Sequence, residues 1–153
     1  MYPCEREKEA APAEYLGYIC YNYNIVKGKE ALKDFVQKTL GCGCPEEVFR
    51  QIESNADFPL NDHVRAGRIN VGNRLLIYVV EIKEEETLVS LLPFLIEKGK
   101  TERDSLQFNR FRLVLATDDN STIDQKAKAL FETIQKDEKI YLHTIKRKDI
   151  PPL

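Results

Sequence analysis

The fold is decided by the segment VRAGRINVGNRLLIYVVEI, which spans residues 64–82. At its centre the dipeptide Gly72-Asn73 separates two apolar runs, and a two-residue connection of this composition is typical of a tight β-hairpin turn. The segment therefore predicts antiparallel strands over 64–71 and 74–82. The second run is apolar on both faces, which favours a central place in the sheet. A phase change in the first run predicts a β-bulge near Gly67.

Downstream of the hairpin, amphipathic helices alternate with strands. The first helix is indicated by apolar residues at helical spacing, namely Leu88, Leu91, Leu92, Leu95 and Ile96. The pattern predicts helices over 87–97 and 123–135 and strands over 108–117 and 139–146. Pro93 is expected to kink or split the first of these helices. Because each helix is long enough for a crossover, the last three strands are predicted to be parallel.

Upstream of the hairpin, the sequence predicts two helices joined by a tight turn. Apolar residues at helical spacing over 29–40 indicate the first helix, and Gly41 is a natural residue to end it. Pro45 suits the start of the second, and residues 55–62 read as a loop. We therefore expect a mixed α/β fold with a four-stranded sheet, made of one antiparallel hairpin and parallel crossovers. Helices pack on this sheet, and a helical hairpin precedes it in the chain.

The length of 153 residues and mass of 17.7 kDa indicate one domain with one core. We divide this single domain, 1–153, into a Tyr-rich segment over 1–27, the helical hairpin over 28–55 and the sheet unit over 63–147. Five of the seven tyrosines lie in the first segment. Since tyrosine needs an apolar surface and a polar outlet, this segment is expected to dock on the protein's own core or to form a homodimer contact.

Composition narrows the class of protein. With 42% hydrophobic and 31% charged residues, the chain fits a soluble globular protein and not a disordered one. No apolar run approaches the roughly 20 residues of a membrane span, and the charged start predicts a cytoplasmic location. The net charge of −2 gives no overall attraction to nucleic acid or membrane. No motif of a familiar enzyme class occurs, which leaves open whether the protein is an enzyme.

Cys42 and Cys44 flank one glycine in the predicted helix-to-helix turn. Such a pair can chelate zinc or another soft metal, supply two ligands to an iron-sulfur cluster, or cycle as a small disulfide. Cys44 lies at or next to the start of the second helix, where the helix end favours a thiolate. A structural zinc site needs four ligands, and the other candidates, at no standard spacing, are Cys4, Cys20, His63 and His143. The alternative is that both cysteines are small buried residues where two helices converge.

Arginines are concentrated between residues 65 and 112. The six members of this group are Arg65, Arg68, Arg74, Arg103, Arg110 and Arg112. Arginine recognises carboxylates and phosphates, so we predict an anion-binding surface made by Arg110, Arg112, Arg68 and Arg74. Strand alternation places Arg110 and Arg112 on one face with Phe108. The alternative is ordinary pairing with the glutamates and aspartates nearby in sequence.

Two further groups are weaker candidates. Asp118 and Asp119 follow a predicted parallel strand, where two carboxylates could hold Mg²⁺, although they fit a helix start better. His143 is expected to be a hydrogen-bonded interior residue, and His63 beside Asp62 could supply a base or a ligand.

Two segments carry a resemblance to a known family. The segment TLGCGCPEEVF at 39–49 and the segment FNRFRLV at 108–114 resemble a family of uncharacterised archaeal and bacterial cytoplasmic proteins, over roughly residues 30–120. The resemblance implies no activity and no catalytic residues, but it makes these segments the places to look. The residues themselves leave three roles open for the protein: soft-metal binding or thiol redox chemistry at Cys42 and Cys44, binding of an anionic ligand or partner, or a structural homo-oligomer.

Overall fold

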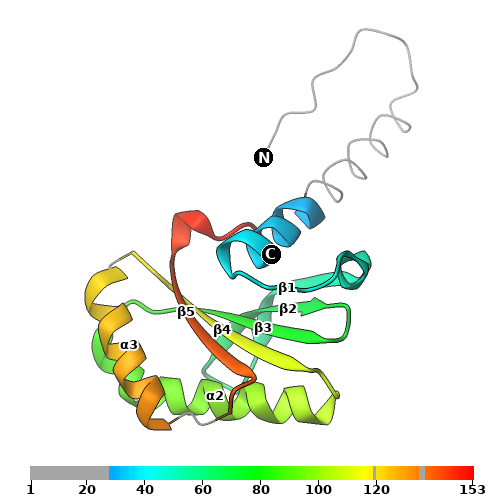
Figure 1. Ribbon diagram of the computed structural model, residues 1–153. Coiled ribbons are helices and arrows are strands. Elements are labelled where there is room, and N and C mark those ends of the chain that lie inside the picture. The colour runs from blue at the N-terminus through cyan, green and yellow to red at the C-terminus, as the bar shows by residue number, and fades with distance from the viewer. Residues whose placement is uncertain (1–27, 119, 135–136) are drawn as a thin grey trace, which may run out of the picture.

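The computed structural model describes residues 28–118, 120–134 and 137–153. It shows a mixed α/β fold with one five-stranded sheet, in the order β1-β2-β3-β4-β5 (Figure 1). The strands are β1 Ile52–Pro59, β2 Arg65–Val71, β3 Leu75–Glu81, β4 Arg110–Thr117 and β5 Ile140–Lys146. Neighbours β1 to β3 are antiparallel and β3 to β5 are parallel, so the predicted hairpin and the predicted parallel strands are confirmed.

The turn of the hairpin has the predicted chemistry. Gly72 and Asn73 have φ angles of 59° and 56°, and two successive positive φ angles define a turn whose twist matches that of the paired strands. The Asn70 side chain accepts a hydrogen bond of 2.9 Å from the Asn73 amide and so supports the turn. β3 lies between β2 and β4, and residues 75–78 are fully buried, which confirms its central place.

The predicted bulge lies in the neighbouring strand. Asn55 pairs with Arg68 and Phe58 pairs with Ala66, so β1 contains one extra residue opposite β2. The ladder between β2 and β3 is regular from Gly67 onward. The phase change in the sequence of β2 therefore reflects burial on both faces of this strand.

Two helices make the crossovers between the parallel strands and lie together on one face of the sheet (Figure 1). They are α2, Leu88–Ser105, which follows the short 3-10 helix η3, Glu85–Thr87, and α3, Asn120–Ile134. Both were predicted, but α2 is longer than expected and Pro93 lies inside it without splitting it. Gly99 allows close packing, because a Cβ there would lie 2.1 Å from the ring of Phe111 in β4.

The four-strand count and the helical hairpin were wrong. Residues 28–34 are α-helical and continue into a π-helical turn, η1 Phe35–Thr39, but the second helix is only a 3-10 helix, η2 Glu46–Arg50. The chain then enters β1 directly. β1 was missed because it is an exposed edge strand with one fully buried residue, Ile52, and so has no apolar alternation. The Tyr-rich segment 1–27 lies outside the described residues.

The opposite face of the sheet is covered by the start of the described chain and by its end. Helical residues 28–39 lie across the sheet from α2 and α3 (Figure 1). Buried side chains of this layer are Leu32, Phe35, Val36, Leu40, Cys42 and Phe49, and they pack on Ile69, Val71, Leu75, Ile77 and Val114 of the sheet. After β5 the chain forms a last 3-10 helix, η4 Arg147–Asp149, and Ile150 and Leu153 join this second cluster. Within the described part of the chain, no helix has the length and apolar character of a membrane span.

Candidate functional site

The Cys42–Cys44 turn begins where the first helical segment ends. Gly41 has a φ of 68°, the left-handed conformation that commonly ends a helix. On either side of it, the Leu40 amide donates to the Phe35 carbonyl at 2.9 Å and the Cys42 amide donates to the Val36 carbonyl at 3.0 Å. The predicted helix end at Gly41 is confirmed, and these two bonds hold the backbone of Cys42 against the helix.

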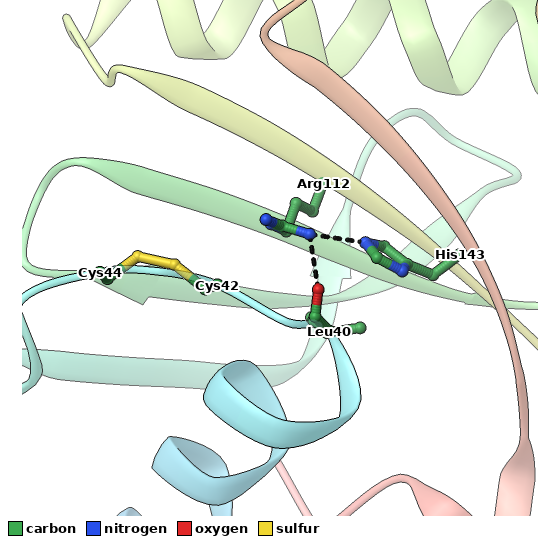
Figure 2. The surroundings of a disulfide bond; sticks show 5 residues. All are labelled: Leu40, Cys42, Cys44, Arg112 and His143. Atoms are coloured by element: carbon green, nitrogen blue, oxygen red, sulfur yellow. Dashed lines mark hydrogen bonds between the residues drawn. A yellow bond between two sulfur atoms is a disulfide. The ribbon is translucent and has the colours of Figure 1, made fainter.

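Cys42 and Cys44 are joined in a disulfide, with their Cα atoms 5.3 Å apart (Figure 2). The disulfide is one of the three chemical states that the sequence left open for this pair. The two sulfur-bearing residues differ in accessibility, because Cys42 is buried at 7% exposure whereas Cys44 is partly exposed. Any external thiol therefore reaches Cys44 more easily than Cys42.

The helix start after Cys44 is weaker than predicted. Pro45 is the N-cap residue and η2 begins at Glu46, so Cys44 lies next to the cap. A five-residue 3-10 helix has few aligned peptide dipoles. Electrostatic support for a Cys44 thiolate must therefore come from side chains.

Arg74 and Arg110 supply positive charge beside Cys44. All three line one cavity of about 160 Å³ at the amino ends of β3 and β4. The strand starts are held together there, since the Asn109 and Arg110 amides donate to the Arg74 carbonyl at 2.7 and 3.1 Å. The remaining lining residues, none of them acidic, are Gly43, Pro45, Val48, Val71, Leu75 and Asn109. Within residues 28–118, 120–134 and 137–153, neither arginine side chain forms an ion pair or hydrogen bond.

Arg112 lies two residues further along the same face of β4 and is buried at 5% exposure. Its Nη1 donates to the Leu40 carbonyl at 2.8 Å and to Nε2 of His143 at 2.9 Å (Figure 2). The guanidinium also stacks over the ring of Tyr141, 4.5 Å from its centroid. Burial lowers the pKa of Arg112, and the nearby charge of Arg110 lowers it further. Because Leu40 directly precedes Gly41, Arg112 connects the start of the cysteine turn to the centre of the sheet.

His143 is hydrogen-bonded, as the sequence predicted, and is partly buried on β5. Burial, and secondarily the charge of Arg112, lower the pKa of His143 to about 4. The imidazole is therefore neutral at physiological pH, and its Nε2 accepts the hydrogen bond from Arg112. Strand alternation explains the meeting, since Arg112 and His143 lie on neighbouring parallel strands and on the same face.

The predicted arginine surface is divided between the two faces of the sheet. Arg68 faces α2, where its Nε donates to Glu102 at 2.5 Å, and Glu102 also accepts a hydrogen bond from Tyr78. Arg65 pairs with Asp57 in β1. Only Arg74 and Arg110 converge, with Arg112 buried beside them. The predicted placement of Phe108 on the face of Arg110 and Arg112 is wrong, because Phe108 packs among buried residues of α2. It precedes β4, which begins at Arg110, so strand alternation does not extend to it.

The association of the cysteine turn with Arg74 and Arg110 was not predicted. It depends on the packing of residues 42–48 across the amino ends of β3 and β4, which no local pattern in the sequence signals.

In the described ranges, 28–118, 120–134 and 137–153, no group of three or more His, Cys, Asp and Glu residues is placed to hold a metal. Cys4 and Cys20 lie outside them. The carboxylate of Asp118 contacts Arg147, 3.8 Å away, at the opposite end of the strands.

Comparisons with known proteins identify no relative of this chain. No protein-family model matches the chain, and searches of curated proteins and of solved structures likewise give no match.

Proposed function

We propose that Cys42 and Cys44 form a redox couple that exchanges between disulfide and dithiol by reaction with external thiols. The observation that supports this proposal is the partly exposed Cys44 of a disulfide, in a cavity lined by two arginines without ion pairs. Reactive cysteines characteristically lie in electropositive, partly exposed surroundings, because a nearby positive charge stabilises the thiolate.

A purely structural role accounts poorly for this disulfide. Cross-linking residues two positions apart restricts the unfolded chain little, and the loop-entropy relation gives about 1.6 kcal/mol, against about 3 kcal/mol for a 15-residue loop. The turn is already held by the Gly41 conformation and by the hydrogen bond that the Cys42 amide donates to the Val36 carbonyl. If the predicted cytoplasmic location is correct, a disulfide there is more often a catalytic or sensing one than a structural one.

The exchange follows from the unequal exposure of the two cysteines. An external thiolate attacks Sγ of Cys44, a new S–S bond forms between them, and the Cys42–Cys44 bond breaks with its electron pair on Sγ of Cys42. A second thiolate then attacks the external sulfur of this mixed disulfide and releases Cys44 as a thiolate. Both protein thiolates take up protons, so two thiols are oxidised to one external disulfide while one protein disulfide is reduced.

The test is to equilibrate the full chain in dithiothreitol or glutathione buffers of graded potential, trap free thiols by alkylation and quantify each cysteine peptide. We expect Cys42 and Cys44 to gain and lose label together, as one two-electron couple, and Cys42→Ser to abolish the transition at Cys44. A pair that stays oxidised in excess dithiothreitol, or that does not re-form after reduction, would contradict the proposal. Stoichiometric zinc on the anaerobically reduced protein, lost in Cys42→Ser, would favour soft-metal binding instead.

A second candidate function is anion binding at Arg74 and Arg110, favoured by their lack of ion pairs in the described part of the chain. An anion bound only by the folded state stabilises it, by about 2.7 kcal/mol at 100 times Kd. Because sulfate also stabilises proteins by exclusion from their surface, the comparison is between wild type and Arg110→Ala in the same salt. We expect a smaller rise in Tm for the variant, and equal gains would count against the site.

A further inference from the structure

We propose that the external thiol that reacts at Cys44 is a small anionic thiol, one that carries a carboxylate or another negative group a few bonds from its sulfur. This inference rests on the proposed redox function and names its substrate class. It follows from the size, the charge and the composition of the cavity that Cys44 shares with Arg74 and Arg110.

The size of the cavity favours a small group. Its volume of about 160 Å³ lies below the roughly 300–1,000 Å³ of pockets that enclose a drug-sized ligand. That space accommodates the short arm of a low-molecular-weight thiol, whereas a folded protein partner would have to insert a side chain of similar size. Because Cys44 is part of the wall, a thiol held here lies beside the residue that it attacks.

The charge of the cavity selects for a negative group. Two guanidinium groups line it, no acidic residue does, and neither guanidinium is neutralised within residues 28–118, 120–134 and 137–153. Arg112, buried behind Arg110, adds a third positive charge, and its hydrogen bonds go to the neutral Leu40 carbonyl and His143 ring. Its buried Nε atom has no hydrogen-bond partner. Within the described ranges, the site is thus a concentration of positive charge that no acidic side chain neutralises.

The remaining wall suits the carbon chain of such a thiol. Pro45, Val48, Val71 and Leu75 provide apolar surface in the cavity that Cys44 shares with the two arginines. A thiol with one or two methylene groups between sulfur and anion can place the methylenes on this surface, its charge on the arginines and its sulfur at Cys44.

The test compares three thiols with the same two-carbon chain: 2-mercaptoethanesulfonate, 2-mercaptoethanol and cysteamine, which are anionic, neutral and cationic. The rate constant for reduction of Cys42–Cys44 is measured for each at low salt, expressed per concentration of thiolate and corrected for the intrinsic nucleophilicity of the sulfur. At contact distance in water, one pair of unit charges changes a rate by about fivefold. We therefore expect the anionic thiol to react at least about fivefold faster than the neutral one, and the cationic thiol to react more slowly.

Variants and salt test whether the two arginines cause the faster reaction of the anionic thiol. In Arg74→Gln/Arg110→Gln the ratio of anionic to neutral rates should fall towards one. Both side chains are exposed, and the structural hydrogen bonds of Arg74 and Arg110 are made by their main chains, so this variant should fold. Arg65→Gln, another exposed arginine at a different place on the sheet, should keep the wild-type ratio. High salt should reduce the preference in wild type by screening.

The outcomes distinguish this inference from the proposed function. Reduction of the disulfide at equal corrected rates by all three thiols would overturn the anionic substrate class and leave the redox function standing. A preference that survives in Arg74→Gln/Arg110→Gln would overturn the assignment to these arginines. Failure of every thiol, and of dithiothreitol, to reduce the pair would overturn the redox function and this inference with it.

Discussion

Arg112 of β4 donates a hydrogen bond of 2.8 Å to the main-chain carbonyl of Leu40, a residue 72 positions earlier in the chain. Leu40 directly precedes Gly41, the glycine at which the helix ends and the cysteine turn begins. The position of the disulfide is thus tied to a buried side chain of a central strand and does not depend on the loop alone.

This contact predicts a measurable loss of stability in Arg112→Met. The substitution keeps an unbranched apolar stem but leaves the Leu40 carbonyl and Nε2 of His143 without their donor, and a buried acceptor left unpaired costs about 1–3 kcal/mol. We expect the free energy of unfolding in urea to fall by about 2 kcal/mol. The control is Arg65→Gln, which removes an exposed ion pair and should cost less than about 1 kcal/mol. Equal losses in the two variants would contradict a special role for Arg112.

His143 predicts a specific dependence of stability on pH. Its pKa is lowered to about 4 in the folded protein, against about 6.5 in an unfolded chain. Between these values the unfolded state binds more protons, so this part of the stability is complete above pH 6.5 and is lost as the pH falls towards 4. After discounting for partial exposure of the ring, the loss is about 2 kcal/mol.

The measurement is the free energy of unfolding at pH 7 and at pH 4.5, for wild type and for His143→Gln. Carboxylates that titrate in this range do so in both proteins. The loss of unfolding free energy between pH 7 and pH 4.5 in wild type, minus the same loss in the variant, therefore gives the contribution of His143. A wild type and a variant that lose the same stability on acidification would show that His143 does not titrate as its surroundings imply.

Two glycines in the cysteine turn offer a matched pair of substitutions. Gly41 has a φ of 68° whereas Gly43 does not lie in the left-handed region, and a Cβ on either would meet no atom within 4 Å. Gly41→Ala should therefore cost about 1–2 kcal/mol through backbone conformation alone, and Gly43→Ala should be close to neutral. Thermal unfolding of both variants, oxidised and then reduced, gives the comparison. A larger effect at Gly43 would mean that the turn differs from the one described.

Gly99 predicts a loss of stability from a substitution that favours helix formation. Alanine has the higher helix propensity by about 1 kcal/mol, but its Cβ would lie 2.1 Å from the fully buried ring of Phe111. We expect Gly99→Ala to lower the free energy of unfolding by about 1–3 kcal/mol, since overpacking a core outweighs propensity. A more stable variant would show that α2 can move away from β4 at little cost.

The predictability of this fold follows from where its residues are buried. β2, β3 and β4 lie in the interior of the sheet and are buried over most of their length. α2 and α3 carry apolar stripes, so the sequence pattern identified all of these elements. β1 has polar residues over most of its length and is a strand because it pairs with the backbone of β2. Backbone pairing leaves no mark in side-chain composition, which explains why this strand was assigned to a helix end and a loop.

The candidate site was only partly predictable, for a related reason. Cys42, Cys44, Arg74 and Arg110 were each identified from residue type and local spacing. Their shared cavity depends on how the segment 42–48 packs on the sheet, which is a tertiary property. Conversely, alternation on β2 places Arg68 on the face covered by α2, where Glu102 holds it, so it could not join the other arginines.

The strand order in the sheet is also the order in the chain, from β1 to β5. No strand has to be inserted between two partners that are already paired, and every strand after the first can add to the free edge of its immediate predecessor. Assembly therefore requires only one loop or one crossover to close at each step, which keeps the entropic cost of each pairing low. During synthesis on a ribosome, such a chain can extend its sheet from the amino-terminal end at the pace at which the strands emerge.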